Sequence, residues 1–146
     1  MTAARRRGVA AALLAATIAA GLVSRTWPLP GLLAEHTGDA LYATAVFLVA
    51  ATAAPGLGTG RLALLAGAFA GLVECSQLLQ WHWLVALRST RPGALLLGQG
   101  FQAADLVALA VGVLVGVAAD VTFLRRSTRP RAQPDRLPHH STGPRT

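Results

Sequence analysis

Four apolar stretches joined by short polar connections limit what this chain can fold into. They cover residues 9–24, 40–57, 62–79 and 103–124. An α-helix needs about 20 apolar residues to cross the roughly 30 Å hydrocarbon core of a bilayer, and no segment shows the alternation of a barrel strand. Apolar residues make up 53% of the 146-residue chain and charged residues only 13%. We therefore predict an all-α fold, an integral membrane four-helix bundle.

The positively charged residues alternate between the two sides of these stretches. All 13 are arginines, and ten of them lie before the first stretch, between the second and third, or after the fourth. The remaining three occupy the other two connections: Arg25, Arg88 and Arg91. The positive-inside rule then predicts a membrane protein with both termini in the cytoplasm. Because the charges flank apolar stretches, we expect membrane lipids as partners and no nucleic acid, despite the net charge of +7.

The two ends of the chain differ from the predicted membrane domain, residues 1–126. Residues 127–146 are rich in Pro, Arg, Ser and Thr, so we predict a disordered basic cytoplasmic tail. At the other end, Arg5–Arg7 and the following Ala-rich segment also resemble a secretory signal peptide, whose cleavage would leave three spans. A retained first helix is favoured, because further spans follow and the charged Arg25 comes directly after the apolar segment.

Acidic side chains occur where three of the stretches meet the predicted outer side. Asp39 precedes the second stretch, Glu74 lies about five residues inside the end of the third, and Asp105 opens the fourth. Charges within a span usually face protein, and small residues at helical spacing mark helix contacts. On the third stretch the inward face is predicted to be Gly67, Gly71, Glu74 and Leu78, with Gln77 in the same sector. On the fourth it is predicted to be Asp105, Ala108, Gly112 and Gly116.

These observations predict a polar pocket in the outer leaflet. An isolated buried charge costs several kcal/mol, so pairing of Arg25 and Arg88 with Glu74 and Asp105 is the expected solution. The candidate residues are Arg25, Asp39, Glu74, Gln77, Arg88, Gln99 and Asp105. The alternative is that the ion pairs only hold the outer loop in place.

The connection over residues 80–102 is long and mixed in character. Trp81 and Trp83 form an aromatic patch which, like Trp27, falls at the outer interface, where indole rings prefer to lie. Residues 93–101 are apolar but too short to span, so we expect this loop to be interfacial or partly re-entrant. Gly98–Phe101 leads into a helix N-terminus that can favour an anion.

Metal and nucleophile chemistry have weaker support in the sequence. His82, Glu74 and Asp105 could approach one another, while His36 is poorly constrained, and no ligand pair has a recognised metal spacing. The sequence shows no Ser/His or Cys/His arrangement that would provide a catalytic base for Ser76 or Cys75. We therefore expect no metal and no cofactor.

Several short motifs within residues 21–118 resemble a known bacterial family. They are Gly21-Leu22-x-x-Arg25, Gly38-Asp39-Ala40-Leu41-Tyr42-Ala43, Glu74-x-Ser76-Gln77-Leu78, Trp83-Leu84-x-x-x-Arg88 and Leu97-Gly98-Gln99-Gly100-Phe101-x-x-x-Asp105-Leu106. Together they look like domain of unknown function 2809, which is itself similar in layout to VanZ-like membrane proteins. The resemblance implies a multi-span inner-membrane protein without an established activity, and it brings no catalytic residues. The similarity in layout to VanZ-like proteins implies a role in the cell envelope, by analogy only.

Three functions fit these observations. The first is a cell-envelope binding or accessory protein whose outer pocket takes a lipid or glycolipid head group. The second is a scaffold subunit, including a homo-oligomer, that packs through its small-residue helix faces. The third is a small membrane enzyme acting on a lipid head group, with Glu74 or Asp105 as general base. We rank them in this order, so an enzyme is the least expected.

Overall fold

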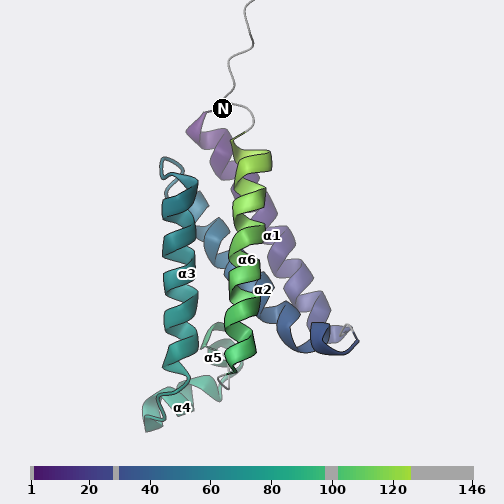
Figure 1. The fold of residues 1–146 in the computed structure, drawn as a ribbon, viewed down its shortest axis with the longest axis vertical. Coiled ribbons are helices and arrows are strands. Elements are labelled where there is room, and N and C mark those ends of the chain that lie inside the picture. Colours follow the sequence, from purple (N-terminus) through teal and green to yellow (C-terminus); the bar gives the residue numbers. More distant parts are fainter. Residues whose placement is uncertain (1, 28–29, 98–101, 126–146) are drawn as a thin grey trace, which may run out of the picture.

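The computed structural model describes residues 2–27, 30–97 and 102–125, with backbone only for residues 32–35. These residues form six α-helices and one π-helical turn, and no strand occurs among them (Figure 1). The helices are α1 (Ala3–Thr26), α2 (Leu32–Ala53), α3 (Thr59–Ser76), α4 (His82–Arg88), α5 (Arg91–Leu97) and α6 (Ala103–Ala119), and the π turn is Asp120–Leu124. The predicted all-α class is confirmed.

The four long helices correspond to the four apolar stretches. Helix α2 begins at Leu32, eight residues before the predicted stretch, and ends at Ala53. This end is expected, because Pro55 disfavours a helical conformation in the residue that precedes it. Two segments, α1 and the continuous helix over Ala103–Leu124, are long and apolar enough to cross a membrane.

The long helices run alternately in opposite directions (Figure 1). Helix α2 packs against α1, α3 and α6, and α3 also packs against α6. The start of α1, the α2–α3 turn and the π turn lie at one end, which we call the N-terminal end. At the opposite end, which we call the α4 end, α1 and α3 finish, α2 and α6 begin, and α4 and α5 are located. The α4 end is the one predicted to face outward.

The contact between α2 and α6 depends on two glycines of α6. A Cβ atom on Gly112 would overlap the carbonyl oxygen of Ala40, and one on Gly116 would lie 2.6 Å from the ring of Phe47. The hydroxyl of Thr44 donates a hydrogen bond of 2.8 Å to the carbonyl oxygen of Gly112. The predicted inward face of the fourth stretch is therefore confirmed, since small residues let the two backbones approach closely.

The inward face of α3 is one residue away from the predicted one. Its buried residues are Leu62, Ala66, Ala70 and Glu74. Gly67 and Leu78 are exposed, and no neighbouring atom lies within 4 Å of a Cβ built on Gly71. The prediction was correct for Glu74 and wrong for the glycines and for Leu78. The physical reason is that Ala70 packs against Ala43 and Leu109, so the alanine side of α3 fills the contact.

A buried ionic cluster closes the N-terminal end. The side chain of Asp120 is fully buried and accepts hydrogen bonds from Arg6 (2.9 Å), Thr59 (2.6 Å) and Arg125 (2.7 Å). Arg6 also donates to the carbonyl oxygen of Pro55, and Arg125 donates to that of Leu57 over 2.7 Å. We call Asp120, Arg6, Arg125 and Thr59 the Asp120 cluster. It joins α1, the α2–α3 turn and the end of α6.

The predicted outer connection contains two short helices, α4 and α5, at the end of α3 (Figure 1). Trp81 precedes α4 and Trp83 lies within it; both are exposed, and their ring centroids are 6.0 Å apart. Two earlier predictions lie outside the described residues: the anion-favouring Gly98–Phe101 segment, which includes Gln99, and the tail over 127–146.

Candidate functional site

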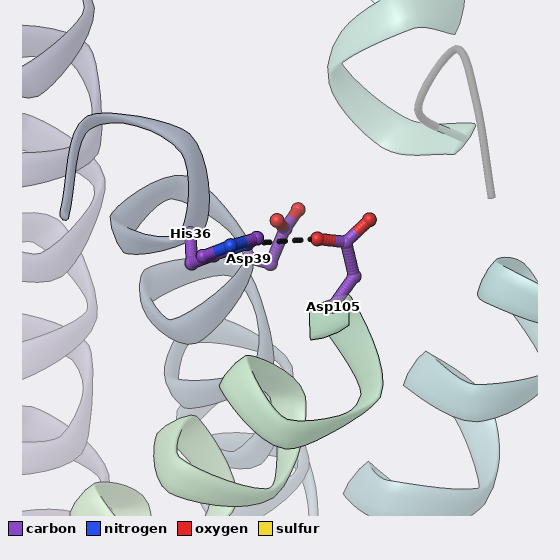
Figure 2. A group of neighbouring side chains, drawn as sticks. All are labelled: His36, Asp39 and Asp105. Carbon is purple, nitrogen blue, oxygen red and sulfur yellow. Dashed lines mark hydrogen bonds and ion pairs between the residues drawn. The ribbon is translucent and has the colours of Figure 1, made fainter. Parts of the chain in front are cut away.

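Three side chains that can ligate a metal meet at the α4 end (Figure 2). His36 and Asp39 are three residues apart on α2, which places them on the same side of that helix, and both point toward Asp105 in the first turn of α6. The Nδ1 atom of His36 lies 3.0 Å from Oδ1 of Asp105. One potential ligand atom from each residue lies within 4.8 Å of the other two. We call this group the His36 cluster.

Negative charge in the His36 cluster is unfavourable. Asp39, which directly precedes the apolar stretch 40–57, is half-buried, and this burial together with the nearby Asp105 raises the pKa of its carboxyl group. The charges of His36 and Arg25 oppose this shift without cancelling it. Because two carboxyl groups and an imidazole lie so close together, a bound cation would offset the like charge of the carboxylates.

Glu74 and Gln77 form a second polar pair, on α3 and at its end. Both are buried, with 4% and 7% of their surface exposed, and Nε2 of Gln77 donates a 2.8 Å hydrogen bond to Oε2 of Glu74. Within the described part of the chain, Oε1 of each residue has no hydrogen-bond partner. The charges of Asp105 and Asp39 both act on the Glu74 carboxylate. This pair is therefore electrostatically coupled to the His36 cluster.

The arginines do not take the positions that the sequence predicted. Arg88 is buried and donates hydrogen bonds to the carbonyl oxygens of Ser76 (2.6 Å) and Leu79 (3.1 Å), at the end of α3. Arg25 is exposed in the last turn of α1. Among the described residues the arginine–carboxylate ion pairs are Arg6–Asp120 and Arg125–Asp120, and His36 contacts Asp105. The predicted pairs with Glu74 and Asp105 are not formed among the described residues; Arg88 instead binds carbonyl oxygens at and just after the end of α3.

This role of Arg88 gives a testable expectation. Arg88→Gln is expected to destabilise the α3–α4 junction by about 1–3 kcal/mol, because two partly buried carbonyl groups lose a charged donor whose own side chain is buried. Hydrogen exchange of the backbone amides over 82–88, measured by mass spectrometry in detergent, would report the loss as faster exchange. Arg91→Gln is the matched control, since Arg91 is exposed. Equal exchange in the two variants would contradict the assignment.

An open apolar groove starts beside the His36 cluster. It has a volume of about 450 Å³ and lies between α2 and α6. Its lining residues are His36, Thr37, Ala40, Ala104, Val107, Ala108 and Val111. His36 thus belongs to both the His36 cluster and the lining of the groove.

Two site features were missed in the sequence. His36 was considered too poorly constrained, although the His-x-x-Asp spacing of His36 and Asp39 on one helix is a usable signal. His82, the histidine that seemed able to approach the carboxylates, is exposed on α4 and does not belong to the cluster. Asp120 was treated as part of an apolar stretch. Its signal was an acidic residue inside that stretch, five residues before Arg125.

The structure defines an all-α protein with two helices that can cross a membrane and a group of polar side chains at one end. Residues 28–113 match the family model described as Protein of unknown function (DUF2809), and the chain belongs to this family. The match includes the His36 cluster and Glu74, and it confirms the predicted family; the Gly21–Arg25 motif lies before the matched residues. No solved structure matches the chain.

Proposed function

We propose that this protein is a four-span protein of the bacterial inner membrane that binds an envelope lipid at its outer, α4 end. Both termini are cytoplasmic. The head group of the lipid contacts the His36 cluster and the Glu74–Gln77 pair, and its hydrocarbon chain lies in the α2–α6 groove. In this role the chain is a binding or accessory protein of the cell envelope, which agrees by analogy with the similarity in layout to VanZ-like proteins.

The distribution of exposed apolar residues supports four spans. Leu64 and Leu72 on α3 and Val107 and Leu114 on α6 each expose about two thirds or more of their surface. Soluble monomers seldom expose apolar patches larger than a few hundred Å², whereas a lipid-facing surface is apolar throughout. Trp27, Trp81 and Trp83 are exposed on segments at the α4 end, as expected for an interfacial belt.

The proposed topology can be tested with single cysteines. Cys75 is the sole cysteine, so Cys75→Ser gives a background without thiols. In that background, Ser89→Cys is expected to react with a membrane-impermeant maleimide in intact spheroplasts. Gly56→Cys, in the exposed α2–α3 turn, is expected to react only after lysis. The reverse pattern, or equal labelling before lysis, would contradict the orientation.

The observation that supports lipid binding most is the adjacency of a polar cluster and an apolar groove with His36 in both. A lipid likewise has a polar head group joined directly to a hydrocarbon chain. A phosphate–arginine contact has less support, because Arg88 is engaged with carbonyl oxygens and Arg25 is not among the residues that line the groove. The cationic part of a head group, or a bound cation, fits the acidic cluster better.

Native mass spectrometry after extraction in mild detergent tests this function. We expect a co-purified lipid on the wild-type chain. Ala104→Trp fills the groove and should reduce the lipid-bound fraction roughly tenfold, equivalent to about 1.4 kcal/mol. Leu114→Trp is the matched control, because Leu114 is exposed on α6 and outside the groove lining. Equal lipid retention in both variants, or a wild-type chain that is folded and lipid-free, would contradict the proposal.

A scaffold role is the second candidate, and one observation favours it. Gly67 and Gly71 form a small-residue face on α3. Within the described residues, a Cβ on Gly71 would meet no atom within 4 Å, and one on Gly67 would lie 4.0 Å from Val113. Such a face suits contact with a second copy of the chain in lipid. The same mass spectra report the oligomeric state. Dimers that persist without lipid and are lost in Gly71→Leu would favour the scaffold.

A further inference from the structure

The His36 cluster has the donor set of a metal site, and this possibility goes beyond lipid binding. We propose that His36, Asp39 and Asp105 bind a divalent transition metal ion, with Zn²⁺ as the best match. The proposal does not require the lipid of the proposed function, because all three ligands belong to this chain. It differs from the sequence-based expectation, which included no metal.

The spacing of the three ligand atoms can be compared with that around a coordinated ion. Zn²⁺ ligands at about 2.0–2.2 Å from the metal lie about 3.3 Å from one another in a tetrahedral site. In the His36 cluster the His36–Asp105 pair already lies at 3.0 Å, and all three ligand atoms lie within 4.8 Å of one another. Two ligands three residues apart on one helix and a third from a facing helix form a recurrent arrangement of metal sites in helical proteins.

The Glu74–Gln77 pair adds a further carboxylate and a buried acceptor close enough to act electrostatically on the His36 cluster. Glu74 is 4% exposed and Gln77 is 7% exposed; the backbone N–H of Gln102 acts on the Glu74 carboxylate, and Oε1 of Gln77 is buried without a hydrogen-bond donor in the described structure. Buried acceptors of this kind normally have a partner. Glu74 also lies within reach of the charges of Asp39 and Asp105. A divalent ion in the cluster would offset the repulsion among three carboxylates from three helices.

The ligand types favour a transition metal over other cations. Mg²⁺ and Ca²⁺ prefer sites made only of oxygen, whereas an imidazole nitrogen with two carboxylates suits Zn²⁺ or a related ion. Three protein ligands leave at least one coordination position for water or another molecule. His36 also lines the α2–α6 groove, so that position would be accessible to the head group of a lipid in the groove.

The test uses the full chain without a histidine tag, extracted in detergent, treated with chelator and then equilibrated with Zn²⁺ or Co²⁺. We expect about one Zn²⁺ per chain by elemental analysis and visible absorption bands from bound Co²⁺. His36→Ala and Asp105→Asn should each weaken Zn²⁺ binding by at least about tenfold. His82→Ala, and the double variant His139→Ala with His140→Ala, are matched controls and should bind like the wild type. Circular dichroism confirms that each variant is folded; for a variant that is not, His36→Gln or Asp39→Asn takes its place.

Two results would overturn the metal site. One is unchanged Zn²⁺ affinity in His36→Ala and Asp105→Asn. The other is binding that disappears with the His139 and His140 changes, which would place the ion in the tail. Lipid retention measured in chelator keeps the two proposals separate. Lipid bound without any Zn²⁺ site leaves the proposed function standing, and Zn²⁺ bound without lipid leaves only the metal site.

Discussion

Asp120→Asn is expected to lower the free energy of unfolding in detergent by about 3 kcal/mol, the largest effect of any single substitution considered for this chain. Asp120 is fully buried and is the acceptor for both Arg6 and Arg125. Replacing the carboxylate leaves two guanidinium groups beside an uncharged amide. Removing one partner of a buried pair costs more than the pair itself contributes, because a charge stays buried without compensation.

The thermal unfolding of purified protein, followed by circular dichroism, measures this effect. Arg6→Gln should also be destabilising, since Arg6 is mostly buried and reaches both α6 and the α2–α3 turn. Like Arg6→Gln, Arg61→Gln removes one positive charge, but it does so at an exposed position of α3, so it is the matched control. An Asp120→Asn protein as stable as the Arg61→Gln protein would show that the Asp120 cluster does not hold the N-terminal end together.

Gly112→Ala is expected to separate α2 from α6 and to cost about 1–3 kcal/mol, as overpacking of a close contact does. The new methyl group would overlap the backbone of Ala40, which has no flexible atom to move aside. His36 and Asp39 are on α2 and Asp105 is on α6, so the same displacement should also weaken binding at the His36 cluster. One substitution, made in the middle of the helices, should thus reduce both stability and ligand retention.

Gly71→Ala is the matched control for this prediction. No neighbouring atom lies within 4 Å of a Cβ built at Gly71, so alanine should be tolerated and should add helix propensity of up to about 1 kcal/mol. Thermal unfolding and native mass spectrometry of both variants provide the comparison. Destabilisation by Gly71→Ala but not by Gly112→Ala would mean that the glycine face of α3, and not that of α6, makes the close contact.

The comparison of these glycines shows what the spacing of small residues can and cannot predict about the inward face of a helix. The Gly112–Gly116 pair and Asp105 recur at helical spacing, and α6 does bury that face against α2. The same reasoning placed Gly67 and Gly71 inward on α3, where the buried residues are Ala66 and Ala70. Both alanine and glycine are small enough for a helix contact, so spacing alone could not distinguish two faces of α3 that differ by one residue.

The ionic contacts show a second limit of prediction from the sequence. Asp120 and Arg125 are five residues apart, about 140° around an α-helix, and would not face each other in one. The π turn over Asp120–Leu124 changes this, and Nε of Arg125 reaches Asp120 over 2.7 Å. The sequence offers several possible hydrogen-bond acceptors for Arg88. In the structure Arg88 donates to the carbonyl oxygens at the end of α3. These partners depend on local backbone geometry that a residue list does not contain.

The sequence by itself determined the helical class, the family and the inward direction of Glu74 and Asp105, because apolar length, motif spacing and the cost of a charge in lipid are local properties of the chain. Only the tertiary structure decided that His36 joins Asp39 and Asp105, that Arg88 binds the end of α3, and that Asp120 joins three segments. Each of these depends on the rotation of one helix against another. That rotation is set by side-chain packing between residues far apart in the chain, which no single stretch of sequence specifies.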